Sequence, residues 1–210
     1  MTQAVEYRNG PWRVRGAREA FDNPWLSLID YEVTHPDGRE GSYGVVRFKN
    51  RAIGVLPIDD EGRVYLVGQH RFPLGRYSWE LPEGGAPKSE DALEGAKREL
   101  AEETGLTARH WTPLLSFDIS NSVTDEEAIC FLAAGLEAGE SAPDPTEILE
   151  LERVPFAALL ERVLNGDIRD SLTIVMTLAA YAKALRGELP GPISSAIGFG
   201  RPRITPEEGL

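Results

Sequence analysis

The amino-acid sequence predicts an α+β domain that is preceded by a β-rich piece of chain. Two hairpin patterns come first, because runs rich in β-branched and aromatic residues flank turn residues at positions 36–38 and 59–62. From position 90 to position 104 the pattern changes to that of a helix, and Gly105 suits the left-handed cap that ends many helices. Strands interspersed with a few helices are typical of domains that mix both types of structure.

The expected elements follow one another along most of the chain. A strand is expected where apolar and β-branched residues run between turn residues, and a helix where apolar residues recur three and four positions apart. The expected strands cover residues 25–33, 43–48, 52–58, 63–68, 78–81, 112–116, 128–133 and 149–154. The expected helices cover residues 90–104, 156–164 and 171–185.

This order of elements divides the chain into three parts. Residues 1–50 are expected to form a β-rich N-terminal subdomain, and residues 51–186 the main domain. Residues 187–210 are rich in proline and glycine and have no periodicity, so we expect an extended C-terminal tail.

The composition excludes several classes of protein. Hydrophobic residues make up 41% of the chain and charged residues 27%, as in ordinary globular proteins. No run approaches the roughly 18 apolar residues of a membrane span, and no basic region followed by an apolar one marks a secretory signal. Cys130 is the only cysteine, so it forms no internal disulfide. We therefore expect a cytoplasmic protein that does not associate with a membrane.

The net charge of −12 argues against a general nucleic-acid binder, because such proteins neutralise phosphates with basic residues. The same charge sets a condition for any substrate that carries phosphate. An acidic protein needs local cations to hold it, supplied by arginine, lysine or a bound metal.

Three glutamates of the expected helix share one side of it. At about 100° per residue, Glu99, Glu102 and Glu103 fall within an arc of roughly 100° beside an apolar stripe. Like charges this close repel one another, and we expect no basic side chain of that helix face to compensate them. Mg²⁺ combines carboxylates, waters and phosphates in its sites and would suit this cluster. The alternative is an acidic helix face that contacts only solvent.

The residues around these glutamates follow a longer pattern that resembles the Nudix box of the Nudix hydrolase superfamily. Every defining position is filled, namely Gly84, Glu90, Arg98, Glu99, Leu100, Glu102, Glu103, Gly105 and Leu106. Ser89 stands where many relatives carry glycine, and serine is a good helix N-cap, so we expect it to be tolerated. The resemblance implies the Nudix fold for residues 51–186, a mixed β-sheet sandwiched between α-helices.

The same resemblance implies a metal site. Glu99 and Glu103 would be the main ligands, and Glu102 would be a further ligand or would help to activate water. The backbone carbonyl of Glu83, the residue before the box glycine, would be an additional ligand. The implied cofactor is Mg²⁺, with Mn²⁺ as a substitute.

Two stretches outside the box narrow the resemblance to one branch of the superfamily. Residues 69–82 and 165–173 are similar to the segments before and after the box in ADP-ribose and nucleotide-sugar diphosphatases. In that branch the N-terminal β piece often exchanges between the subunits of a dimer and helps to hold the nucleotide. The resemblance therefore implies a homodimer and a nucleotide-sugar substrate.

Three residues are candidates for binding that substrate. Arg71 would grip the diphosphate, because a guanidinium binds phosphate oxygens with two parallel hydrogen bonds. Glu80 would position the substrate or metal-bound waters, and Trp25 would stack on the base. The alternatives are a solubilising arginine, a structural carboxylate and an aromatic residue of the core.

The general base that takes the proton of the attacking water has three candidates. The resemblance points to a glutamate on a loop before the last strand, which is Glu147 here. Glu126 and Glu102 are the alternatives. The operating pKa of such a carboxylate depends on neighbouring charges and metal, and sequence alone does not determine it.

Together these features predict a Mg²⁺-dependent hydrolase that cuts the diphosphate of ADP-ribose or a related nucleotide sugar. Asn121 stands where members that prefer ADP-ribose often have a proline, so other nucleotide sugars stay equal candidates. Two alternatives remain open. One is a Nudix-derived module that senses a nucleotide sugar without cutting it. The other is hydrolysis of a different diphosphate, such as a dinucleoside polyphosphate or a coenzyme A derivative.

Overall fold

The computed structural model describes residues 6–139 and 148–197. The chain folds into two compact units, and each unit draws on several segments of the sequence. Unit 1 consists of Met1–Ala52, Gly85–Glu90 and Phe117–Ala128. Unit 2 consists of Ile53–Gly84, Asp91–Ser116 and Ile129–Leu210.

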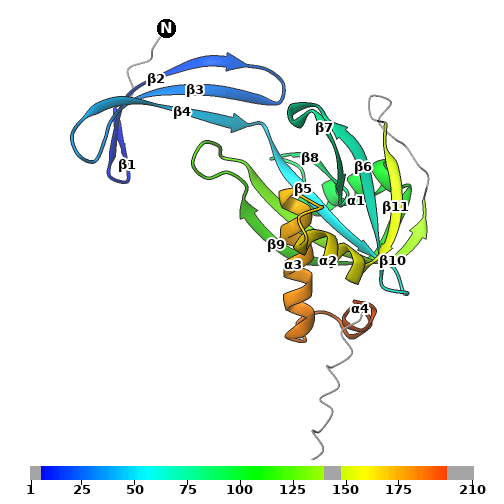
Figure 1. The fold of residues 1–210 in the computed structure, drawn as a ribbon. Helices are drawn as coiled ribbons and strands as arrows, with labels where there is room; N and C mark the ends of the chain where they lie inside the picture. Colours follow the sequence, from blue (N-terminus) through cyan, green and yellow to red (C-terminus); the bar gives the residue numbers. More distant parts are fainter. Residues whose placement is uncertain (1–5, 140–147, 198–210) are drawn as a thin grey trace, which may run out of the picture. The chain divides into compact units, whose positions relative to one another are not determined.

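Unit 1 contains a four-stranded antiparallel sheet in which neighbours in sequence are neighbours in space (Figure 1). Its strands are β1 (Tyr7–Asn9), β2 (Trp12–Asp22), β3 (Leu26–Thr34) and β4 (Glu40–Phe48). The predicted hairpin is confirmed as β3 and β4, which pair from Leu26 opposite Phe48 to Thr34 opposite Glu40. The prediction missed β1 and β2. In β2, arginine and glutamate fill many positions and hide the alternation of apolar and polar residues on which the prediction relied.

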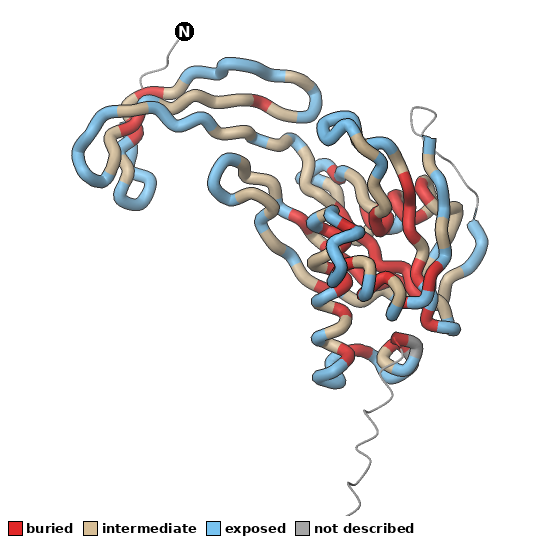
Figure 2. Tube along the Cα trace, in the orientation of Figure 1, coloured by how far each residue is buried: buried red, intermediate tan, exposed pale blue. Residues whose placement is uncertain are grey.

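The sheet of unit 1 has little core of its own (Figure 2). Val14 and Val33 are its buried apolar side chains, and the ring of Trp12 packs edge-on against that of Tyr43. Trp25 is 66% exposed, so the alternative that it belongs to the core of its own unit is wrong.

A second sheet has seven strands, five of which lie side by side in the order β11-β6-β5-β10-β9, while β7 pairs with β6 and β8 pairs with β5 (Figure 1). The strands are β5 (Asn50–Ile58), β6 (Arg63–Arg71), β7 (Arg76–Glu80), β8 (Glu83–Pro87), β9 (Leu106–Asp118), β10 (Glu127–Ala138) and β11 (Glu150–Pro155), with a 3₁₀ turn, η1 (Phe72–Leu74), before β7. Six of these strands were predicted. β8 was not, because its Glu-Gly-Gly-Ala-Pro sequence is typical of a loop.

The described residues of unit 2 also form four helices, namely α1 (Ala92–Thr104), α2 (Phe156–Leu164), α3 (Ser171–Leu185) and α4 (Gly191–Ala196). α2 and α3 have the predicted bounds. α2 contacts β6, β11 and α3, and α1 contacts β6. The core between these helices and the sheet is almost fully shielded from solvent (Figure 2), and its largest side chains include Phe156, Leu66, Leu132 and Met176.

Two details at helix ends correct the predictions. The N-cap of α1 is Asp91 and not Ser89, because the Asp91 carboxylate accepts hydrogen bonds from the backbone N–H groups of Leu93 and Glu94. The tail is not extended up to Ile197, since it contains α4 and buries Ile193 against unit 2. Gly105 ends α1 with φ 67°, as predicted. None of the described helices has the length and hydropathy that a membrane span requires.

Candidate active site

The segment from Glu80 to Gly84 joins β7 to β8, and neighbouring elements fix its backbone. The Leu81 N–H donates a 2.8 Å hydrogen bond to the buried hydroxyl of Thr173 in α3. The Pro82 carbonyl accepts a 2.9 Å hydrogen bond from the Val55 N–H in β5. Backbone groups this deeply buried need such partners, so α3 and β5 together determine where Glu83 and Gly84 lie.

The same segment receives the carboxylates of α1. The Glu103 carboxylate accepts a 2.9 Å hydrogen bond from the Glu83 N–H. The Glu99 carboxylate lies directly against Gly84, in space that a Cβ atom at position 84 would fill. Glu99 and Glu103 are 7% and 9% exposed, which is rare for glutamates unless they are paired or bind metal. The structure thus brings together three of the four predicted metal-binding residues: Glu83, Glu99 and Glu103.

Glu102 differs from its two neighbours on α1. Its side chain is 35% exposed, and Arg98 one turn earlier donates to its carboxylate over 2.9 Å. The same Arg98 Nη1 lies 2.8 Å from Glu99. The expectation that no basic side chain of this face compensates the glutamates is therefore wrong, because residues four apart on a helix are neighbours.

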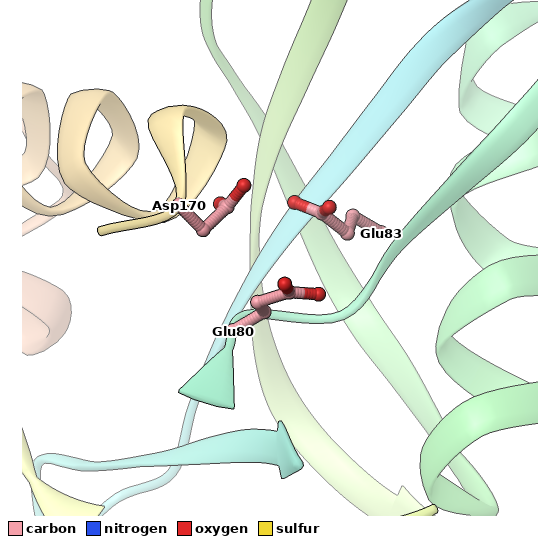
Figure 3. A group of neighbouring side chains, drawn as sticks. All are labelled: Glu80, Glu83 and Asp170. Carbon is pink, nitrogen blue, oxygen red and sulfur yellow. The ribbon is translucent and has the colours of Figure 1, made fainter. Parts of the chain in front are cut away.

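A second acidic group lies on the other side of the segment. Glu80 ends β7, Glu83 begins β8, and Asp170 is the N-cap of α3, where it accepts a hydrogen bond from the Thr173 N–H. Figure 3 shows the three carboxylates pointing toward one another, and each offers an oxygen that lies within 4.8 Å of the others. Among the described residues, the glutamates of α1 do not form such a group.

Arg71, at the end of β6, is held by this second group. Its Nε donates to both Glu80 oxygens over 3.1 and 2.9 Å, and its Nη2 donates to Glu80 over 2.6 Å and to Glu83 over 2.8 Å. Burial disfavours the charged guanidinium, but the bonds to Glu80 and Glu83 more than offset this and raise the pKa of Arg71. Glu80, which is only 3% exposed, is the buried partner in this ion pair.

The environment of Glu83 disfavours its negative charge. Burial raises the pKa of the Glu83 carboxyl well above its usual range, and the nearby charges of Asp170 and Glu80 add to this rise, while Arg71 opposes it. The sequence pattern indicated only the backbone of Glu83 as a ligand and gave no functional role to Asp170. Asp170 directly precedes a predicted helix, and this position indicates a helix N-cap but not a place in an acidic cluster.

Three of the predicted residues are not among the described residues of unit 2. Glu126 and Trp25 belong to unit 1, and Glu147 lies outside the described residues. Glu126 is half-buried, and burial, with a smaller contribution from Asp125, raises the pKa of its carboxyl.

The loop that contains Asn121 docks on β4 within unit 1. The Val46 N–H donates to the Val123 carbonyl over 2.9 Å, and the Tyr43 hydroxyl donates to the Ser122 carbonyl over 2.6 Å. Between this loop and the strands lies a cavity of about 270 Å³. Its lining includes Trp12, Tyr31, Tyr43, Arg47 and Asn121, so it offers aromatic faces together with polar groups.

Comparison with known proteins identifies the family to which this chain belongs. The family model of the NUDIX domain matches residues 48–173. The chain therefore belongs to the Nudix family. It is 34% identical to the ADP-ribose pyrophosphatase of Mycobacterium tuberculosis, over 69% of this chain and 71% of the relative. It is 32% identical to the ADP-ribose pyrophosphatase of Bacillus subtilis, over 74% of this chain and 84% of the relative.

A solved structure supports the fold. The crystal structure of an ADP compounds hydrolase superposes with a TM-score of 0.75 at 18% identity, over 84% of this chain and 96% of that chain. The predicted α+β Nudix fold is thereby confirmed.

The fit between Gly84 and Glu99 yields a prediction. In Gly84→Ala the new methyl group would overlap the Glu99 carboxylate, so Glu99 must move away from Glu83. We expect a folded protein whose hydrolytic kcat/KM falls about tenfold or more, because small displacements of catalytic groups are costly. Gly191→Ala, where a methyl group meets no atom within 4 Å, is the matched control. Parent-like kinetics of Gly84→Ala would show that the position of Glu99 is unimportant.

Proposed function

We propose that this protein hydrolyses the diphosphate bond of nucleoside diphosphate sugars, ADP-ribose among them, and releases a nucleoside monophosphate and a sugar phosphate. The observation that carries the proposal is the burial of Glu99 and Glu103 against the Glu83–Gly84 backbone. Membership of the Nudix family and similarity to two ADP-ribose pyrophosphatases support it.

Mg²⁺ is the proposed metal, and Mn²⁺ its substitute. The donors would be the carboxylates of Glu99 and Glu103 and the backbone carbonyl of Glu83, and Glu102 would be a further ligand. These are oxygen atoms, the ligands that hard divalent cations prefer. When bound, Mg²⁺ would neutralise phosphate oxygens and lower the pKa of a bound water.

Arg71 is the proposed contact to the diphosphate. Glu80 and Glu83 occupy its Nε and Nη2 and so fix the plane of the guanidinium. Its Nη1 makes no hydrogen bond to a described residue and is the donor that a phosphate oxygen would meet. Glu80 would act through Arg71, as a positioning residue.

The general base remains a choice between Glu147, Glu126 and Glu102. Burial raises the pKa of the Glu126 carboxyl, which is the direction that suits a general base. The cavity of unit 1 offers stacking surfaces through its aromatic rings and hydrogen bonds through Arg47 and Asn121. Trp25, exposed on the same unit, is a further stacking candidate.

A substrate panel tests the proposed reaction. Purified protein is incubated with Mg²⁺ and with ADP-ribose, other nucleotide sugars, a dinucleoside polyphosphate or coenzyme A, and a phosphatase then reports the monophosphates released. We expect turnover of at least one nucleotide sugar, its loss with EDTA and its recovery with Mg²⁺. Binding of a nucleotide sugar without turnover would identify a sensor module. Turnover of coenzyme A or the polyphosphate alone would identify a different hydrolase.

A second prediction concerns the ligand role of Glu103. Glu103→Gln keeps the size of the side chain and an acceptor for the Glu83 N–H but removes a charge. We expect a normal fold and a loss of activity on the order of 10²-fold or more at saturating Mg²⁺. Glu94→Gln removes an exposed carboxylate from the same helix and is the control. If Glu103→Gln stays within a few-fold of the parent protein, Glu103 is not a metal ligand.

We also propose a homodimer in which unit 1 supplies the contact. Its four-stranded sheet buries little apolar surface of its own and leaves Trp25 and Phe21 more than half exposed. Sheets of this kind are marginally stable unless one face packs on something else. Val33 of the same sheet offers no surface for such a contact, because its side chain is buried within its own sheet.

Light scattering tests the dimer. We expect a mass of about twice 23.1 kDa for the parent protein at micromolar concentration. In the double variant Trp25→Ser/Phe21→Ser the loss of apolar contact should shift the mass toward 23.1 kDa. Leu185→Ser, which removes an exposed apolar side chain from the end of α3, is the control. A parent protein with the mass of a single chain would refute the dimer.

A further inference from the structure

Hydrogen bonds to three elements of unit 2 hold the backbone of the segment Glu80–Gly84, and one of them differs in kind. Two come from the backbone of β5 and from the carboxylate of Glu103, itself a proposed metal ligand. The third comes from Thr173 of α3, whose neutral hydroxyl accepts from the Leu81 N–H over 2.8 Å. Of these three contacts, the one with Thr173 is thus made by a side chain outside the proposed ligand set.

Thr173 is firmly placed in the first turn of α3. Its own N–H donates over 2.7 Å to Asp170, the N-cap of this helix, and its side chain is 0% exposed. Leu81 is also 0% exposed, so no solvent water would take the place of a missing hydroxyl. A buried backbone N–H is costly without an acceptor. Without the Thr173 hydroxyl, the Leu81 N–H would therefore move toward another acceptor or stay unsatisfied.

The chain between Leu81 and Glu83 is too stiff to absorb such a movement. The ring of Pro82 locks its φ at roughly −65°. Leu81 precedes this proline and is restricted to extended conformations for that reason. A displacement at the Leu81 N–H is accordingly passed on to Glu83, whose backbone carbonyl is a proposed metal ligand.

We propose that Thr173 is a positioning residue of the metal site, because its hydroxyl sets the place of the Glu83 carbonyl relative to the carboxylates of Glu99 and Glu103. The inference rests on the proposed function, which places the metal at these oxygens. It goes further, since Thr173 is not a ligand itself and acts through the backbone of the segment. Removing a partner that holds a metal ligand in place typically costs about 10- to 100-fold in metal affinity.

The affinity for Mn²⁺ tests the proposal without an activity measurement, and electron paramagnetic resonance of the free ion reports it. Thr173→Val keeps the branched shape of the side chain and removes the acceptor, so we expect a dissociation constant about tenfold higher or more. Thr173→Ser keeps the hydroxyl and should stay within about threefold of the parent protein. Loss of Mn²⁺ binding in Glu103→Gln identifies the ion as the one held by the α1 carboxylates.

Thr177→Val is the matched control. Thr177 lies one turn later on α3 and is also 0% exposed, but its hydroxyl makes no hydrogen bond to a described residue. The same chemical change at this position should leave the affinity for Mn²⁺ unchanged. Circular dichroism reports whether each variant is folded. If Thr173→Val is not, Thr173→Ala is compared with Thr173→Ser, because these two variants differ by the hydroxyl oxygen alone.

Three results would overturn the role of Thr173. They are parent-like affinity of folded Thr173→Val, an equal loss in Thr177→Val, and a loss in Thr173→Ser as large as in the variant without a hydroxyl. Each of these leaves the metal site and the proposed hydrolysis intact. A parent protein that binds no Mn²⁺ would overturn the metal site together with this inference.

Discussion

The position of five residues, Glu80 to Gly84, is the constraint on which the candidate site depends. This segment is anchored to β5 through Pro82, to α3 through Leu81 and to α1 through Glu83. Each anchor is a hydrogen bond of a backbone group in a buried region, where an unsatisfied group costs on the order of 1 to 3 kcal/mol. The sheet and two helices must therefore be assembled before the acidic side chains meet. A metal bound at this segment would accordingly link its binding to the folding of the protein.

Much of unit 2 was predictable because its signals are local. The periodicity of apolar residues gave the bounds of α2 and α3, and Gly105 ended α1 as predicted. The spacing of Glu99 and Glu103 on a helix placed them on one face, and the structure shows that face buried. A helix repeats every 3.6 residues, so residues that share a face are determined by sequence separation alone.

What was missed depends on contacts between residues distant in the chain. Nothing near Asp170 in sequence indicates that it meets Glu80 and Glu83, which lie roughly ninety residues earlier and reach it only through the packing of α3 beside β5 and β7. β8 is a strand because it pairs with β5, and its glycine-rich sequence alone does not indicate this pairing. β2 was hidden by its charged residues, whose side chains extend to solvent from an exposed sheet.

The two acidic groups place opposite demands on Glu83. Its backbone is fixed by Glu103, a contact that is strongest when the Glu103 carboxylate is ionised. Its side chain lies in a cluster whose charges oppose its own ionisation. Arg71 relieves part of that repulsion. Its bonds to Glu80 and Glu83 fix the orientation of its free Nη1, but the same two carboxylates neutralise much of its positive charge. A phosphate would then meet an arginine whose charge is already largely neutralised, so tight binding of an anionic substrate at this point requires additional positive charge. In a chain of net charge −12, bound divalent cations are the source that the surrounding oxygen ligands favour.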